Sequence, residues 1–435
     1  MKKPVRHIDG RIIILPLLLL LTIFVVCFND IFTFVIANII LAMAIGFLVR
    51  MDVKNPIFIW TLVFSLYQIA YPVLNNLGII VYEYCPLNEY YYILSWLATC
   101  FFVIFYGSFN NVRYDRKNIT TEMNVVFLRM LYWFLVALCL VSSITIVKDG
   151  FQSKYDLAQS MNVLLNIGNM AYTALIILPV FFVLSKNISR REKVIIATST
   201  FFFLLVGVFT YGERSYVFNY LLTMMILYFT FRKISLHKVL IIAFCFVLFF
   251  SFSPALKMLF ANEHYSTIND GSNDNIMISF LNSDFSSSGF NFNYVLNHDD
   301  AFALNGKSFF YDVLSPLDGV FNLKKHSSTQ WYTDKYWNKR RTGLGFSLIA
   351  EGYVNFGFLG IIFQMFIIAR LIKFFYLRSN RNCYYYVLYI GLIALAMYSC
   401  RQSLGSVVSP LIKYYAFMCL MVLFANKVGK RGTNE

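Results

Sequence analysis

The sequence predicts an all-α protein that crosses a membrane many times. Of its 435 residues, 59% are hydrophobic and 14% are charged, whereas soluble domains contain about 25% charged residues. The apolar residues gather into about twelve stretches that approach the roughly 20 residues a helix needs to cross a bilayer. Short clusters of Lys and Arg separate these stretches, which is typical of connections that set membrane topology. We therefore expect one integral membrane domain over residues 1–435.

Each predicted span is an apolar run bounded by polar or basic residues. In chain order they are Ile12–Phe28, Ile31–Val49, Ile57–Leu74, Tyr90–Phe109, Val125–Val147, Val163–Ser185, Val194–Tyr211, Tyr216–Phe231, Val239–Leu259, Phe346–Phe375, Tyr384–Cys400 and Ser406–Asn426. The first run follows a basic start and lacks a small-residue cleavage site. We therefore interpret it as an uncleaved span rather than a removed signal.

The distribution of Lys and Arg predicts the orientation. If the N-terminus is cytoplasmic, every cytoplasmic connection is basic, whereas the outer connection Asn75–Glu89 contains acidic residues and no basic one. Because basic residues favour the cytoplasmic side, we expect both termini there. The long polar segment Ala261–Thr342 is then an outer loop, and the active face lies outside.

This outer loop is predicted to fold against the membrane-facing surface of the bundle. Its tryptophans, tyrosines and phenylalanines make it too aromatic for a disordered tether. Apolar residues recur at helical spacing in Asp284–Leu296, which predicts a short helix capped by Asp284 or Ser283. A second helical segment is expected from Gly306 to Pro316, where proline ends it.

Two arginines, Arg214 and Arg401, fall at tight outer turns, where the positive-inside bias disfavours them. A polar stripe at four-residue spacing follows each arginine and would occupy one helix face. The stripes are Ser215, Asn219 and Thr223, and Gly405, Ser409 and Lys413. Two interpretations remain open: the cations bind an anionic substrate, or Arg214 pairs with Glu213 and the hydroxyls join neighbouring helices.

A third polar stripe lies in the apolar run after the outer loop. Ser347, Glu351 and Asn355 recur every four residues and follow a double arginine, Arg340 and Arg341. Ionisable residues inside a membrane are costly and tend to mark substrate paths. Two alternative interpretations remain open: Glu351 lies at the membrane edge and is hydrogen-bonded to helix ends, or it is a structural partner of Lys413 or Arg401.

Composition excludes several other classes of site. The net charge of +15 resides in the short connections, so no basic face remains for nucleic acid. The eight cysteines show no C-x-x-C spacing, so we expect neither a metal site nor a disulfide framework. An outer cavity with several arginines and a lysine suits a lipid-linked anionic substrate, because the planar arginine fork matches phosphate oxygens. Aromatic rings in the loop would stack against sugars.

Three segments resemble one known family. The run GLGFSLIAEGYVNFGFLG from Gly343 to Gly360 is similar to a signature of O-antigen and oligosaccharide repeat-unit polymerases of the Wzy type. The turn Gly212–Ser215 and the segment Gly306–Pro316 also resemble that pattern, and the plan of spans is similar along the whole chain. The turn departs from the pattern at Glu213, where a small residue is expected, so the neighbouring Arg214 is either free or partly neutralised by Glu213.

The resemblance implies a metal-independent glycosyltransferase of GT-C-like architecture, without cofactors, in the bacterial inner membrane. Such a polymerase would transfer a growing glycan from undecaprenyl pyrophosphate to the terminal sugar hydroxyl of an incoming undecaprenyl-pyrophosphate-linked repeat unit, in O-antigen (lipopolysaccharide) or capsule synthesis. A chain-length regulator and a flippase are the expected partners.

We assign roles to individual residues within that chemistry. Arg214 and Arg401, with Arg340 and Arg341, are expected to stabilise the departing pyrophosphate. Glu351 is the candidate acceptor of the hydroxyl proton. The predicted binding residues that complete the site are Lys413, Tyr211, Asn355 and Ser347.

Two related activities remain as alternatives. An O-antigen ligase shares the plan and the donor but differs in the acceptor, and would use a loop histidine such as His298 or His326. A lipid-linked oligosaccharide flippase has a similar number of spans but no use for a long outer loop. A purely structural scaffold would not explain the outer arginines.

Overall fold

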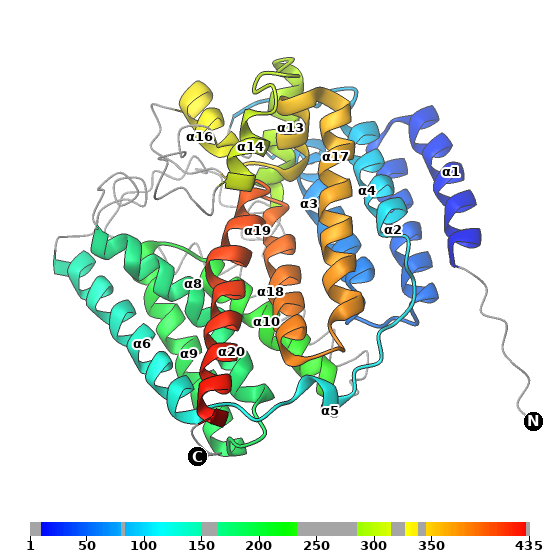
Figure 1. Cartoon of the computed structure of the whole chain (residues 1–435). Coiled ribbons are helices and arrows are strands. Elements are labelled where there is room, and N and C mark those ends of the chain that lie inside the picture. Colours follow the sequence, from blue (N-terminus) through cyan, green and yellow to red (C-terminus); the bar gives the residue numbers. More distant parts are fainter. Residues whose placement is uncertain are drawn as a thin grey trace, which may run out of the picture.

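The computed structural model describes residues 10–79, 83–148, 163–232, 285–314, 327–337 and 345–431. Within these ranges the chain is helical (Figure 1). The helices are α1 (Gly10–Phe28), α2 (Ile31–Leu48), α3 (Pro56–Asn76), α4 (Tyr91–Tyr106), α5 (Arg116–Ile119), α6 (Val125–Lys148), α8 (Val163–Leu184), α9 (Arg190–Tyr211), α10 (Ser215–Phe231), α13 (Ser286–Asn297), α14 (Lys307–Leu314), α16 (Ser328–Tyr332), α17 (Leu348–Arg378), α18 (Cys383–Ser399), α19 (Gly405–Pro410) and α20 (Phe417–Arg431). Two π-helical segments, Thr333–Trp337 and Leu411–Ala416, follow α16 and α19.

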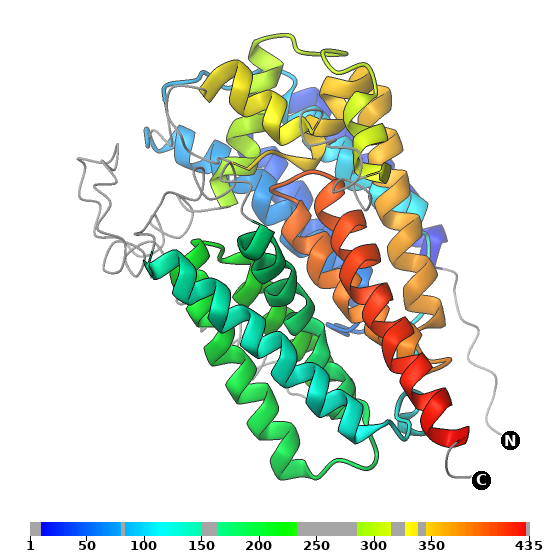
Figure 2. The ribbon, with the colours of Figure 1, turned by 60° about the vertical axis from the view of Figure 1, so that its left-hand side comes forward.

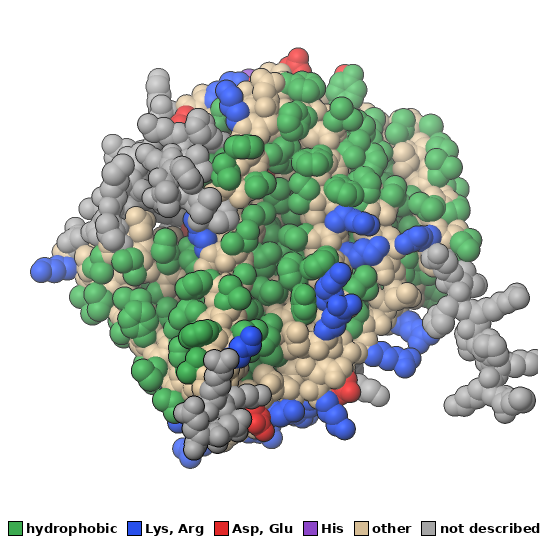
Figure 3. Space-filling view, in the orientation of Figure 1, with side chains coloured by type: hydrophobic (Ala, Val, Ile, Leu, Met, Phe, Trp, Pro, Cys, Tyr) green, Lys and Arg blue, Asp and Glu red, His purple; other side chains and the backbone are tan. Residues whose placement is uncertain are grey.

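The prediction of a polytopic, all-α membrane protein is confirmed for the described ranges. Eight helices are long and apolar enough to cross a membrane, and α4, α10 and α18 are shorter apolar helices. The predicted span Val239–Leu259 lies outside the described residues, so the total of about twelve spans stays a prediction. Large apolar side chains such as Phe47 and Phe424 are exposed on the surface, because lipid rather than water is their solvent. Hydrophobic side chains cover most of the face in Figure 3.

Local capping signals explain where several helices begin. Asp30 accepts a hydrogen bond from the backbone N–H of Thr33 at the start of α2. Ser189 does the same for the N–H of Glu192 at the start of α9. Both side chains satisfy donors that the first helical turn leaves without partners. The polar residues between the apolar runs therefore fix the helix starts.

The helices form two groups joined by α18 (Figures 1 and 2). α6, α8, α9 and α10 pack on one another, and α1 to α4 pack together with α17. α18 lies between the groups and contacts α3, α8, α10 and α17. The space between the groups, near the end that bears α14 and α16, holds the cavity described below.

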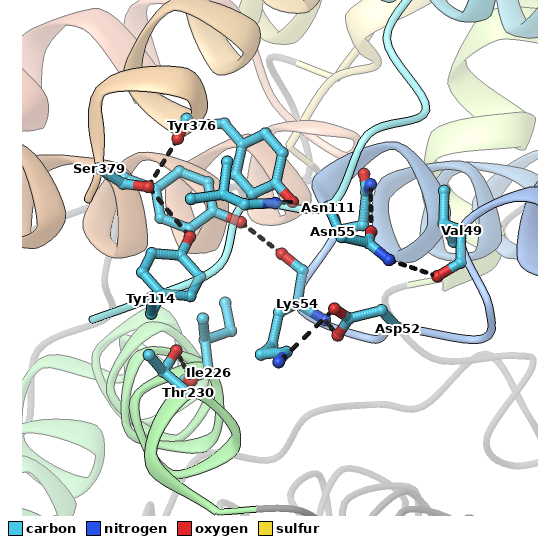
Figure 4. Close-up of polar contacts among 12 residues, drawn as sticks. Val49, Asp52, Lys54, Asn55, Asn111, Tyr114, Ile226, Thr230, Tyr376 and Ser379 are labelled. Atoms are coloured by element: carbon cyan, nitrogen blue, oxygen red, sulfur yellow. Dashed lines mark hydrogen bonds and ion pairs between the residues drawn. The ribbon is translucent and has the colours of Figure 1, made fainter. Parts of the chain in front are cut away.

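The basic connections gather at the opposite end of the bundle. Tyr389 donates a hydrogen bond to the carbonyl of Lys54 at 2.8 Å, and the hydroxyl of Tyr376 accepts one from the N–H of Val112 at 2.9 Å (Figure 4). The C-terminal end of α20 lies at this end too (Figure 1). The predicted alternation of connections therefore agrees with the packing, while the membrane side on which this end lies stays a prediction.

The helix α17 is a hairpin rather than one continuous rod. Phe356 (φ −142°, ψ 30°) and Gly357 (φ 56°, ψ −140°) leave helical geometry, and the positive φ favours glycine. Glu351 and Gln364 are 13 residues apart, about 20 Å along a straight helix, yet their side chains are hydrogen-bonded at 2.7 Å. The short arm (348–355) therefore folds back on the long arm (358–378). The prediction of a single span over Phe346–Phe375 is wrong in this respect, and the long arm alone continues as the span.

Two glycines allow the arms to touch. A Cβ atom on Gly360 would lie 1.9 Å from the carbonyl oxygen of Gly352, far inside van der Waals contact. Gly360→Val should therefore force the arms apart and destabilise the protein by about 1–3 kcal/mol or more. The measurement is the yield of monodisperse protein on size-exclusion chromatography in detergent. Leu359→Ala is the matched control, because Leu359 is 68% exposed on the outer surface. Equal yields of the two variants would contradict the hairpin.

The short helices α13, α14 and α16 cover the end of the bundle opposite the basic connections (Figures 1 and 2). The two helices predicted there are confirmed as α13 and α14. The N–H of Leu304 donates to the carbonyl of Val354 at 2.8 Å, which ties the segment between them to the short arm. The predicted capping residues Ser283 and Asp284 lie outside the described residues. The loop helices thus bury the polar stripe of the short arm.

Candidate functional site

A polar cavity of about 400 Å³ lies between the two groups of helices. Its walls come from α8, α10, α18, α19 and the π-helical segment after α19, and residues of α14 and of the start of α16 line it on the loop side. The described lining residues are Asn169, Thr173, Ile176, Glu213, Ser215, Tyr216, Asn219, Tyr311, Ser327, Thr329, Leu395, Tyr398, Gln402, Ser403, Gly405, Ser406, Ser409, Pro410, Lys413 and Tyr414. The volume falls within the range of small-molecule sites, and the abundance of hydroxyl and amide groups suits a hydroxyl-rich ligand.

Two of the predicted polar stripes meet in this cavity. Ser215 and Asn219 face it from α10, while Ser409 and Lys413 face it from the opposite wall. Thr223, one turn further along α10, is completely buried and is not among the lining residues. The four-residue spacing therefore identified two facing walls that lie far apart in the sequence.

The carboxylate of Glu213 lies in the cavity wall. Its Oε1 accepts hydrogen bonds from the hydroxyl of Ser215 at 2.8 Å and from the hydroxyl of Tyr398 at 3.3 Å. These bonds join the turn before α10 to α18.

Arg214 and Arg401 adjoin residues that line the cavity. Arg401 is half-buried, with its guanidinium 5.2 Å from the centre of the Tyr398 ring. The Arg401 carbonyl accepts a hydrogen bond from the N–H of Phe346 at 3.0 Å, which fixes the turn. Arg214 directly precedes α10 and lies between two lining residues. The predicted binding residues Arg340 and Arg341 lie outside the described residues.

Glu351 is completely buried behind the cavity wall. Its carboxylate accepts hydrogen bonds from the side chains of Ser328 and Gln364 and from the backbone N–H of Leu404, each at 2.7 Å. The hydroxyl of Ser308 donates a fourth bond at 3.3 Å. No Lys or Arg is among its partners within the described ranges, so the alternative pairing with Lys413 or Arg401 finds no support.

A second buried carboxyl group, that of Asp312 on α14, was not predicted from the sequence. Burial and then the charge of Glu351 raise the pKa of Asp312 well above its usual range. Burial therefore favours the neutral form of this carboxyl group. One signal was available: Asp312 lies four residues after Ser308 and so shares its helix face.

The other predicted binding residues lie further from the cavity. Asn355 and Ser347 are completely buried. The Asn355 amide donates a hydrogen bond to the hydroxyl of Ser308 at 2.6 Å, and the Ser347 hydroxyl accepts one from Ser288 at 3.2 Å. They complete the buried stripe of the short arm. Tyr211 packs edge-on against the rings of Tyr172 and Tyr216 and lies behind the cavity wall. The structure thus separates a lining set of residues from a supporting set.

The sequence model of a protein family, O-antigen polysaccharide polymerase Wzy, matches residues 11–431. The chain belongs to this family. The match spans nearly the whole chain, so the hairpin and the cavity are features of a Wzy polymerase, a multi-pass membrane protein of polysaccharide synthesis. Neither the curated proteins nor the solved structures gave a match.

Proposed function

We propose that this Wzy polymerase transfers a growing glycan from undecaprenyl pyrophosphate to the terminal sugar hydroxyl of an incoming undecaprenyl-pyrophosphate-linked repeat unit. The observation that carries the proposal is the polar cavity, which combines hydroxyl and amide groups, four tyrosines and Lys413. Sugars need the hydrogen-bonding groups and the aromatic faces, and a pyrophosphate needs the cation. The product is O-antigen or capsular polysaccharide.

The cationic residues and the supporting residues have different proposed roles. We assign Arg214, Arg401 and Lys413 to the departing pyrophosphate, together with Arg340 and Arg341. These positive charges offset the charge that develops on the leaving group, so the proposed reaction needs no metal or other cofactor. Ser347, Asn355 and Tyr211 support the walls of the cavity. The catalytic role of Glu351 stays a prediction, and its buried position favours support of the wall.

We also propose the setting of the reaction. The end with the basic connections lies in the cytoplasm, with both termini, because basic connections favour that side. The cavity then opens towards the outer face of the bacterial inner membrane, where a flippase would deliver the substrate and a chain-length regulator would limit the product. One membrane domain of GT-C-like architecture would hold the whole site.

The ligase and flippase alternatives have less support. His298 is exposed at the end of α13, stacks on Tyr294 with ring centres 4.4 Å apart, and is not among the cavity-lining residues. A ligase histidine would need contact with the acceptor, and His326 lies outside the described residues. A flippase would spread charge along a central path, whereas Glu213 and Lys413 are the only charged residues among the described lining residues.

Deletion of the gene followed by electrophoresis of surface polysaccharide tests the function. Loss of the polymerase should leave chains of a single repeat, whereas complete loss of surface polysaccharide would indicate a flippase or a ligase. The indole of Ser409→Trp should fill the cavity. Expressed in the deletion strain, this variant should restore less than about a tenth of the long chains that the wild-type gene restores, since steric exclusion of a ligand costs at least 1.4 kcal/mol. Phe424→Trp is the control, because Phe424 is exposed on α20. Long chains in the deletion strain would refute the function.

A further inference from the structure

We propose that Glu213 and Asn219, at the start of α10, form the subsite for the acceptor sugar, with Glu213 as the acceptor of the hydroxyl proton. This inference rests on the proposed function and deepens it. It gives the base role to a residue on the cavity surface rather than to the buried Glu351.

The position of Glu213 is the first argument. Among the acidic residues that the structure describes, Glu213 alone lines the cavity. A general base must reach the proton that it abstracts within hydrogen-bond distance. The hydroxyls of Ser215 and Tyr398 both donate to Oε1 of Glu213, at 2.8 and 3.3 Å, and so orient the carboxylate. Glu351, in contrast, is completely buried and already accepts four hydrogen bonds.

Asn219 supplies an independent observation. Its side chain is only 5% exposed and lines the cavity. Its Oδ1 has no hydrogen-bond partner among the residues that the structure describes. A buried polar atom without a partner costs about 1–3 kcal/mol, so the protein holds this amide ready for a polar ligand. Asn219 is four residues after Ser215 and therefore shares its helix face.

The other lining residues suggest that the two walls of the cavity bind different parts of the substrates. Tyr216 and Tyr398 lie beside the proposed subsite and offer aromatic faces to a sugar ring. Lys413 lies on the wall formed by α19 and the following π-helical segment and offers a cation to phosphate. The acceptor sugar would therefore bind on the α10 side, and the donor pyrophosphate on the α19 side.

The proposed step balances with the groups that the reaction supplies. The acceptor hydroxyl oxygen forms a bond to the anomeric carbon of the growing glycan, while the bond between that carbon and the pyrophosphate oxygen breaks. The electron pair of the broken bond leaves with undecaprenyl pyrophosphate. The hydroxyl proton passes to the Glu213 carboxylate, which later releases it to water.

The test uses full-length protein in liposomes. The probe is the undecaprenyl-pyrophosphate-linked repeat unit extracted from a strain without the polymerase gene. Glu213→Gln should lower kcat about a hundredfold, as loss of a general base does, while KM stays within about twofold. Glu213→Asp should retain part of the activity. The matched control is Glu192→Gln. Glu192 lies on α9 and forms a surface ion pair with Arg129, with 2.7 Å between the Arg129 Nε and the Glu192 Oε1.

Asn219→Leu provides a second readout of the same subsite. It should raise KM for the repeat unit about tenfold, because one hydrogen bond to the acceptor is lost. Normal kcat in Glu213→Gln overturns the base assignment. If that variant does not give monodisperse protein, an unchanged KM in Asn219→Leu overturns the subsite. Absence of polymer with the wild-type protein would instead refute the proposed function.

Discussion

Glu351→Ala is expected to remove most of the folded protein from the membrane. The Glu351 carboxylate joins four donors from separate segments: Ser308, Ser328, Gln364 and the N–H of Leu404. Each buried donor without an acceptor costs about 1–3 kcal/mol. The sum approaches the whole stability of a typical domain, about 5–15 kcal/mol. The measurement is the amount of monodisperse protein after extraction, compared with the wild type.

Asp312→Asn is the matched control for Glu351→Ala. Asparagine has nearly the shape of the neutral carboxylic acid and cannot ionise, so we expect normal yields. Because folding raises the pKa of Asp312, its contribution to stability is full below the unfolded pKa of about 3.9. That contribution is lost as the pH rises through the raised value. The unfolding temperature of Asp312→Asn should therefore depend less on pH than that of the wild type.

A double mutant separates the possible roles of Glu351. If Glu351 served only to neutralise Lys413, Glu351→Gln combined with Lys413→Met would restore folding. The described contacts place Lys413 in the cavity and not beside Glu351, so we expect no rescue. If the Glu351→Gln variant folds normally but its polymerisation rate is about a hundredfold lower, Glu351 rather than Glu213 is the general base.

The second large effect is expected on catalysis rather than on folding. Arg401→Lys keeps the charge but loses the planar fork, which stacks over Tyr398 and matches two phosphate oxygens. Loss of one charge-assisted hydrogen bond, about 1.5–3 kcal/mol, corresponds to a rate roughly 10- to 100-fold lower. Arg214→Lys should behave alike, and alanine variants should be less active still. The measurement is the rate of polymer formation from lipid-linked repeat units.

An exposed arginine provides the comparison. Arg129 forms a surface pair with Glu192, and such pairs contribute little, so Arg129→Lys should polymerise at the wild-type rate. Normal polymerisation by both Arg214→Lys and Arg401→Lys would leave these arginines with a structural or topological role only.

The sequence by itself determined the class of the protein and the positions of the described membrane helices. These properties depend on composition and on the spacing of apolar and basic residues along one segment, so they can be derived locally. The same periodicity placed Ser215 and Asn219 on one wall of the cavity, and Ser409 and Lys413 on the other. It also predicted α13 and α14 within the outer loop.

Only the tertiary structure decided what those residues contact. Glu351 could not be assigned its donors from the sequence, because they come from segments up to 53 residues away. The bend at Phe356 and Gly357 lies inside an apolar run whose composition predicts one span. Only the structure shows the contact between Gly352 and Gly360 that the bend allows. The importance of Asp312 and Glu213 likewise became visible only through their neighbours on other helices, Glu351 and Tyr398. Spacing fixes the face of a helix on which a side chain lies, whereas its partner depends on how the helices pack.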